Sequence, residues 1–312
     1  MTTGRPIALA PLAALMFAAM MFTLAACGGG SAVDPGPPPD VKLDTANHAG
    51  TQALSMDMPA MAAKQYRVAL NRAYERDDAS AIADTAYNLA LAQMRAGDSK
   101  EALRTVREAR ADLDRRRFAI PAELFLVQAA AAYRSGDLAS AYAATQEVLD
   151  RTSKDPDTKP RAWFIRGLVV AERGDGAALA QAIAALPPSK QADLEADRQE
   201  LVGRAALLGN QPAEALTAFE QSAANRQQAL DYRGMARVLA LAGEAALRLN
   251  RTADAADFFL RAGRSALLQG DTTTALPLLK RAEDLARQTS QKDVLDEVVR
   301  LRKAAAASPA RS

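Results

Sequence analysis

Hydrophobic and polar residues in this 312-residue chain fall into blocks that repeat. The stretch at 201–219, LVGRAALLGNQPAEALTAF, returns forty residues later at 241–259 as LAGEAALRLNRTADAADFF, with nine of nineteen positions identical. Self-similarity at a fixed period of this size is typical of stacked repeat proteins. Runs of β-branched and aromatic residues in strict alternation are nearly absent, so no sheet is expected. The pattern predicts an all-α fold.

The best-formed block runs from 83 to 116 and predicts two helices joined by a short turn. Its first helix carries Tyr87 and Ala90, and its second carries Ala102. Small residues at Ala90 and Ala102 would let two antiparallel helices approach closely. Gly97 can adopt the left-handed conformation that ends a helix. Each block is therefore interpreted as one helical hairpin.

Five further blocks carry similar marks, which pair a small residue in the first helix with a small, aromatic or Leu residue in the second. The pairs are Gly50 with Tyr66, Ala129 with Ala141, Gly167 with Leu179, Gly203 with Phe219, and Gly243 with Phe259. Asn210 and Asn250 replace the turn glycine in the last two blocks, since Asn tolerates the left-handed region. Two closing helices are expected at 276–288 and 292–305. Pro277 would sit in the first turn of its helix if Thr273 or Thr274 is the cap.

These marks resemble the tetratricopeptide repeat (TPR), whose pattern includes an aromatic residue, Leu, a small residue and a Gly-Asp turn. The resemblance implies an α-solenoid of about six helix pairs plus C-terminal capping helices over residues 43–305, followed by a disordered tail at 306–312. The blocks start 36 to 40 residues apart, against about 34 in the family. The spacing disfavours a perfectly regular superhelix. Stacked hairpins without a true family relationship are the alternative.

In TPR proteins the first helices of successive units line a concave groove, so the resemblance assigns partner contacts to the matching positions here. Apolar and aromatic side chains flanked by Arg suit an extended peptide or a partner helix. The Lys/Asn clamp that certain family members use for C-terminal carboxylates is absent, because Tyr87 and Leu91 occupy those positions. The groove positions are Tyr87, Leu91, Met94, Arg95, Leu126, Tyr133, Arg134, Arg161, Phe164, Leu168, Arg204 and Arg237.

A basic run between Arg104 and Arg117 offers a second surface. Acidic residues, Glu108, Asp112 and Asp114, are interleaved with the arginines. Charge pairs at helical spacing support a solvated surface helix. The alternative is a contact for an anionic partner or for lipid head groups, so groove and convex basic face remain rival binding surfaces.

The first 26 residues are interpreted as an export signal, with an apolar stretch from Ile7 to Ala26. Leu24-Ala25-Ala26-Cys27 resembles the bacterial lipobox. The resemblance implies cleavage before Cys27, lipidation of that cysteine and attachment to a bilayer. Gly28 in the next position points to the periplasmic face of the outer membrane. Residues 27–42 are then a Gly/Pro-rich tether. An uncleaved membrane anchor and plain secretion are the alternatives.

The amino-acid composition limits the chemistry that the protein can carry out. A formal net charge of +2 with 24% charged residues gives no reason to expect nucleic-acid binding. One Cys and one His provide too few ligands for a zinc site. A Ser–His or Cys–His catalytic arrangement would need His48, which has no nucleophile motif nearby. No metal, cofactor or catalytic residue is therefore expected.

The sequence favours a membrane-tethered TPR scaffold for protein–protein interactions in the bacterial cell envelope, without fixing its oligomeric state. Lipoproteins of this build occur in pilus and secretion-system assembly, so that is the more specific hypothesis. It rests on resemblance of fold alone. A small-ligand or peptide-binding module would instead need a closed apolar cavity. An envelope enzyme would need a carboxylate pair in a deep pocket.

Overall fold

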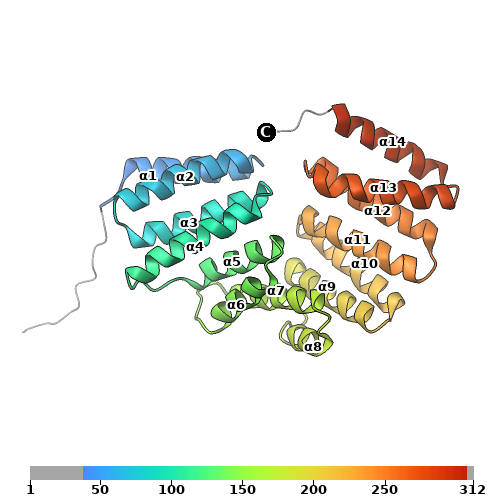
Figure 1. Cartoon of the computed structure of the whole chain (residues 1–312), viewed down its shortest axis with the longest axis horizontal. Helices are drawn as coiled ribbons and strands as arrows, with labels where there is room; N and C mark the ends of the chain where they lie inside the picture. Colours follow the sequence, from blue (N-terminus) through green and yellow to red (C-terminus); the bar gives the residue numbers. More distant parts are fainter. Residues whose placement is uncertain (1–37, 308–312) are drawn as a thin grey trace, which may run out of the picture. The chain divides into compact units, whose positions relative to one another are not determined.

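A computed structural model describes residues 38–307 of the chain, which form fourteen helices and no strand in that range. Within the described range, the residues from Pro39 to Ala307 belong to one compact unit. Figure 1 labels the helices along it. They are α1 (Val41–Ser55), α2 (Pro59–Glu75), α3 (Ala79–Arg95), α4 (Ser99–Arg115), α5 (Ala122–Arg134), α6 (Leu138–Leu149), α7 (Thr158–Glu172), α8 (Gly176–Ala184), α9 (Ala192–Leu208), α10 (Pro212–Gln228), α11 (Tyr232–Arg248), α12 (Thr252–Leu268), α13 (Thr272–Gln288) and α14 (Lys292–Ala307).

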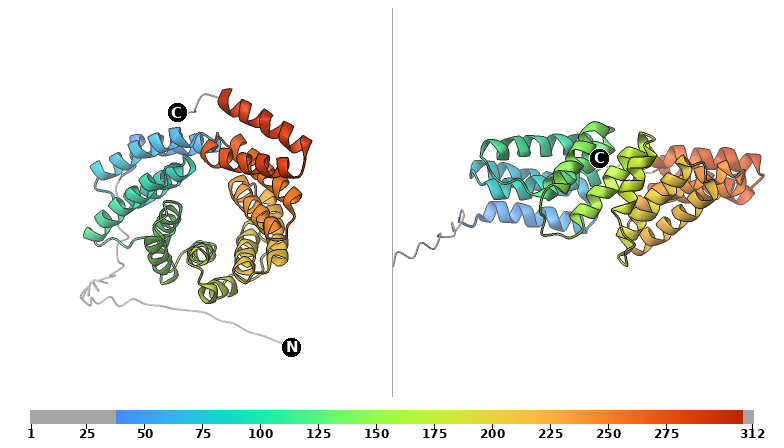
Figure 2. Two further views of the ribbon diagram at one scale, coloured as in Figure 1. Left: turned by 45° about the vertical axis from the view of Figure 1, so that its right-hand side comes forward. Right: turned by 90° about the horizontal axis from the view of Figure 1, so that it is seen from below.

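Consecutive helices pair as hairpins, and consecutive hairpins stack on one another, as Figures 1 and 2 show. Six pairs run from α1/α2 to α11/α12, and α13 and α14 close the stack. The predicted all-α solenoid with about six units and closing helices is confirmed. The stack is least regular at α8, which has nine residues. There α7 contacts both α8 and α9.

The turns within hairpins use the left-handed backbone that the sequence predicted. Gly97 has φ +93°, and Asn210 and Asn250 have φ +55° and +58°. Other turns place residues without this preference in the same region, including Arg117 (φ +55°) and Leu230 (φ +57°). A bulky side chain there costs about 1–2 kcal/mol. The stacked helices around these turns must offset that cost.

Within several hairpins, a glycine in the first helix receives an aromatic ring from the second. A Cβ atom added to Gly203 would lie 2.6 Å from the Phe219 ring, and one on Gly50 would lie 2.7 Å from Tyr66. Gly243 and Phe259 repeat the arrangement. In each pair the ring lies sixteen residues after the glycine. The ring thus fills the space that a Cβ would need, and the helices approach more closely than two larger residues would allow.

The alanines at the equivalent close contacts are buried as predicted. Ala102, Ala141, Ala215 and Ala255 have no exposed surface. Phe219 and Phe259 are also fully buried. The repeat phase derived from the sequence is therefore correct.

The prediction for Pro277 is wrong. Asp271, and neither Thr273 nor Thr274, caps α13, because its side chain accepts a hydrogen bond from the backbone N–H of Thr274. The helix starts at Thr272, which places Pro277 inside it, beyond the first turn. Proline has no N–H to donate, so this helix lacks one backbone hydrogen bond.

The helical body begins slightly earlier than the predicted 43. Asp40, assigned to the tether, caps α1 by accepting a hydrogen bond from the N–H of Leu43, and it also pairs with Arg72 at 2.7 Å. Those partners hold the pKa of Asp40 well below its usual value. At the other end, α14 reaches Ala307. The predicted signal peptide, Cys27, the tether up to residue 37 and the tail from 308 lie outside the described residues.

Within the range 38–307, no helix is long and apolar enough to cross a membrane.

We predict that Gly203→Ala lowers the free energy of unfolding by about 1–3 kcal/mol, because the added methyl group collides with the Phe219 ring. Urea unfolding followed by circular dichroism measures this. Gly176→Ala is the matched control, since nothing lies within 4 Å of that position. Equal stability of the two variants would contradict the proposed contact. In a Phe219→Val background the cost of Gly203→Ala should shrink, which a double-mutant cycle detects.

Candidate partner-binding surface

The predicted groove residues lie on the first helices of five successive hairpins, α3, α5, α7, α9 and α11. At one end, Tyr87 on α3 borders a cavity of about 270 Å3 between α3 and the start of α5. Two carboxylates, Asp84 and Glu123, also line it. Burial raises the pKa of both Asp84 and Tyr87. This end of the surface is therefore acidic and partly desolvated.

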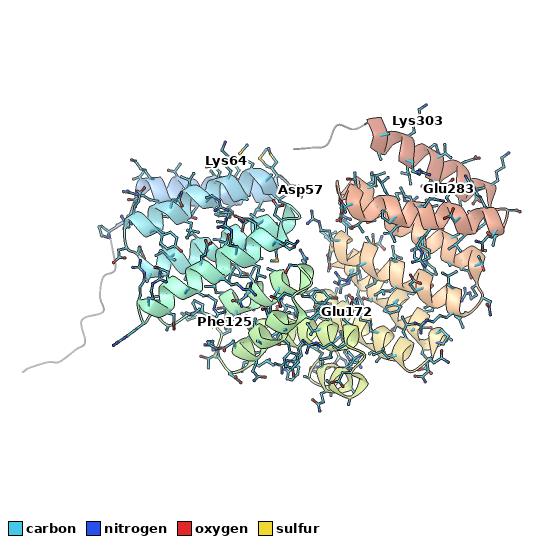
Figure 3. All side chains as sticks on the ribbon, viewed as in Figure 1. Asp57, Lys64, Phe125, Glu172, Glu283 and Lys303 are labelled. Carbon is cyan, nitrogen blue, oxygen red and sulfur yellow. The ribbon has the colours of Figure 1, made fainter. Side chains whose placement is uncertain are left out.

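Farther along, a chain of polar contacts crosses three helices. The hydroxyl of Tyr133 on α5 donates to Glu172 at 3.3 Å. Glu172 is the last residue of α7 and is labelled in Figure 3. It also pairs with Arg204 of α9 at 3.3 Å. Arg204 in turn pairs with Glu200 one turn earlier at 3.1 Å. Predicted groove residues from different hairpins are thus joined by contacts within the protein.

Glu200 lies at the centre of a buried cluster. Its side chain has no exposed surface and accepts hydrogen bonds from Arg226 at 2.7 Å and from Arg237 at 2.9 and 2.8 Å. Burial opposes ionisation of Glu200, but the charges of Arg237, Arg226 and Arg204 outweigh it and hold the pKa below its usual value. Asp197 accepts from Arg226 at 2.9 Å, and burial raises its pKa to about 7. The cluster ties α9, α10 and α11 together.

Several arginines on α3, α5 and α11 form no ion pair within the described part of the chain, among them Arg95, Arg134 and Arg233. Arg134 at the end of α5 makes one long hydrogen bond, 3.5 Å, to the carbonyl oxygen of Met94. Its side chain keeps contact with solvent, yet surrounding protein desolvates it. That desolvation, followed by the charges of Arg237 and Arg233, lowers its pKa. Positive charge from Arg134, Arg233 and Arg237 therefore gathers between α5 and α11, and Asp231 and Glu200 offset part of it.

Two of the predicted groove residues need correction. Met94 and Leu168 are only 7% and 3% exposed, so they belong to the core and offer little surface to a partner. They lie on faces that pack against the neighbouring helices, which helix periodicity alone did not distinguish from the open face.

The large side chains Leu91, Leu126, Tyr133 and Phe164 are partly buried and pack against core residues, so they do serve the solenoid's own packing. Only their exposed edges can meet a partner. Arg161 pairs with Asp193 of α9 at 3.3 Å and with Asp157 at 3.8 Å.

Sequence reasoning missed Glu172, Glu200 and Arg226. The four-residue spacing between Glu200 and Arg204 was the available signal for Glu200. Four-residue spacing brings Glu200 and Arg204 together on one helix face. Nothing in the local sequence linked either residue to Arg226.

The rival basic run is largely neutralised by its own neighbours. Arg104 pairs with Glu101 and Glu108 at 2.6 and 2.9 Å. Arg115 and Arg116 both pair with Asp112. Arg110, on the same helix, lies 3.9 Å from the centre of the Phe125 ring. This pattern favours the solvated surface helix over a contact for an anionic partner.

No protein-family model matches the chain, and no curated protein matches it in sequence. Its fold is similar to that of a tetratricopeptide repeat protein from Parabacteroides merdae, with 14% identity, a TM-score of 0.48, and coverage of 83% of this chain and 99% of that one. It is also similar to the TPR2AB domain of yeast Sti1 in a pHSP90 complex, with 16% identity, a TM-score of 0.32, and coverage of 85% and 98%. The helix pairs and turns of this chain establish its architecture without reference to either similar structure.

We predict that Glu200→Gln destabilises the protein by about 1–3 kcal/mol, since it removes the buried carboxylate that Arg204, Arg226 and Arg237 share, while Arg226 keeps Asp197 and Asp231. Glu220→Gln on α10 is the control, because Glu220 is exposed and should change stability by less than about 0.5 kcal/mol. Chemical unfolding of both variants gives the comparison. Similar midpoints would show that the cluster contributes nothing.

The difference between wild type and Glu200→Gln should depend on pH. Because the pKa of Glu200 is lowered on folding, its contribution is fully present above its usual value of 4.5 and is lost as the pH falls below it. The gap in unfolding free energy should therefore narrow in acid. Asp197 acts in the opposite sense. Its pKa is raised on folding, from 3.8 to about 7, so the folded protein loses stability as the pH rises through that range. A gap that stays constant below pH 4.5 would contradict the assignment to Glu200.

Proposed function

We propose that this protein is a scaffold that binds an extended, acidic segment of a partner protein along the first-helix surface. The observation that carries the proposal is the set of arginines on α3, α5 and α11 without ion pairs in residues 38–307. Arg134 is exposed at the end of α5, where the charges of Arg237 and Arg233 disfavour its own charge and Asp231 opposes them. A partner carboxylate placed between these helices would relieve that repulsion.

The side-chain types on this surface suit such a partner. Guanidinium groups bind carboxylates through two parallel hydrogen bonds, which add direction as well as attraction. Tyr133 presents a partly exposed ring next to Arg134 in the chain, and Tyr87 presents another at the acidic end of the surface. Aromatic residues and Arg often dominate the energy of protein interfaces. The surface therefore combines anchors for apolar groups with fixed positive charge.

A small-ligand module is the second candidate, supported by the cavity beside Tyr87. Its carboxylates, Asp84 and Glu123, would suit a cationic ligand. The scaffold is favoured because its charged surface extends over five helices, well beyond that cavity.

In the same proposal, lipidated Cys27 tethers the scaffold to the periplasmic face of the outer membrane. The lipobox-like Leu24-Ala25-Ala26-Cys27 at the end of an apolar segment supports the tether. Assembly of a pilus or a secretion system is the more specific role, and it is supported by the resemblance to lipoproteins of this build. The work of the scaffold would be to hold a partner near the membrane during assembly.

We predict that the double variant Arg134→Glu/Arg233→Glu recovers at least tenfold less of the partner from envelope extracts, since reversed charge repels an acidic segment. Quantitative mass spectrometry of the captured proteins measures this. The control is Arg117→Glu/Lys190→Glu, which makes the same change in net charge at exposed residues on other parts of the chain.

Circular dichroism must show that both double variants keep their helical content. Capture that is lost only in the control would move the binding site to the convex side. Capture that is unaffected in both variants would exclude an acidic partner.

We predict that Cys27→Ser prevents signal removal and abolishes labelling with a fatty-acid analogue, because serine has no thiol to accept the diacylglycerol. Mass spectrometry and membrane fractionation provide the readouts. An unchanged mature mass with unchanged membrane attachment would refute the tether while leaving the partner surface untouched.

A further inference from the structure

Three methionines lie exposed at the turn between α1 and α2. Met56, Met58 and Met61 have 62%, 44% and 44% of their surface exposed. The other methionines in the described part of the chain are less exposed: Met94 is buried and Met235 is partly buried. Exposed thioethers gathered within six residues are therefore a feature of this turn. Packing of the solenoid does not require them.

The backbone holds these side chains in a fixed arrangement. Met56 follows the last residue of α1, Asp57 takes the left-handed conformation with φ +54°, and Met58 precedes α2. The N–H of Met58 donates to the carbonyl oxygen of Ala53 at 2.8 Å, which closes the turn. This hydrogen bond links the end of α1 to the residue that precedes α2.

The positions of Met58 and Met61 favour convergence of their side chains. Met58 is the N-cap residue of α2, and Met61 is the third residue of that helix. The two residues are three positions apart, a spacing at which side chains on a helix are neighbours. Met56 lies across the turn, on the other side of Asp57. Figure 3 labels Asp57 and Lys64 at this end of the solenoid and shows sulfur atoms outside the ribbon beside them.

We propose that this turn is a binding site for a soft monovalent metal ion, Cu(I) or its analogue Ag(I), held by the three thioether sulfurs. Thioethers are soft ligands that select Cu(I) over hard ions such as Mg2+ and Ca2+, which prefer oxygen. A thioether carries no proton to lose, so binding needs no deprotonation, unlike a thiol or an imidazolium. The carboxylate of Asp57 supplies negative charge within the turn, and Lys64, three residues after Met61 on α2, is the nearest cation in sequence.

Other donors do not compete for such an ion in the described part of the chain. Between residues 38 and 307 no group of three or more His, Cys, Asp or Glu residues could hold a metal. His48 lies two turns before Met56 on α1, too far along the helix to share an ion with it. The site is also independent of the peptide-binding surface on α3 to α11, so it does not rest on the proposed function.

Nuclear magnetic resonance of the full chain, in detergent and with 13C-labelled methionine methyl groups, tests the site. Every sample carries Cys27→Ser, so that no thiol competes for the metal. Silver nitrate is added in chloride-free buffer. Three methyl signals, assigned to Met56, Met58 and Met61 by single Met→Leu substitutions, should shift together and saturate at one equivalent of Ag(I). Mg2+ should shift none of them.

Leucine is the matched substitution, because it keeps apolar character and nearly the same volume but removes the sulfur. The triple variant Met56→Leu/Met58→Leu/Met61→Leu should lose the bound equivalent of Ag(I), and of Cu(I) in an anaerobic titration against a chromophoric chelator. Met94→Leu/Met235→Leu should retain both. Circular dichroism confirms that each variant is folded.

The proposal is overturned if the saturating signals belong to other methionines, including those in residues 1–21, or if the triple variant binds as much metal as wild type. Shifts that grow without saturation would also overturn it, since they indicate unspecific contact. In that case the exposed methionines are better understood as an apolar contact surface, for which leucine would serve equally well.

Discussion

Close approach of the two helices in each hairpin is the constraint on which the rest of this structure depends. A repeat protein has no central core, so each hairpin must be held by contacts within itself and with its neighbours. Gly50, Gly203 and Gly243 allow this approach because each receives a ring that fills the space of a missing Cβ. Where the small residue is alanine, as at Ala90, the residue sixteen positions later is the smaller Val106. The summed volume of the two side chains that meet between the paired helices is thus kept within narrow limits.

Apolar clusters continue from one hairpin to the next, and ion pairs add to these contacts. Arg67 of α2 pairs with Glu101 of α4 at 2.7 Å, and Arg264 of α12 pairs with Glu297 of α14 at 2.8 Å. Exposed pairs of this kind contribute about 0–1 kcal/mol each. Glu200 differs because it is fully buried and must keep its arginine partners. Its main effect is therefore to fix the relative positions of α9, α10 and α11. Its net contribution to the free energy of unfolding is secondary.

The fold could be predicted from the sequence because its determinants are local. The small residues, the left-handed turns at Gly97 and Asn210, and the aromatic partners all recur at fixed spacing. The surface was predicted less well. The family resemblance assigned partner contacts to positions on the first helices, but burial of Met94 and Leu168 depends on how neighbouring hairpins stack. The link between Glu200 and Arg226 depends on the same stacking, which no short-range spacing encodes.

The two proposed sites differ in how they can be coupled to the rest of the molecule. The thioether turn belongs to α1 and α2, whereas the arginines lie on α3, α5 and α11. In a solenoid, each hairpin influences distant ones only through those between them. Tyr66 packs into Gly50, and its hydroxyl is hydrogen-bonded to Thr51 at 3.0 Å, so the first hairpin is internally rigid. A metal ion at its turn would stabilise that hairpin, and any effect on the peptide surface would have to pass through the contact between α2 and α3. That contact is where communication between the two sites would have to be sought.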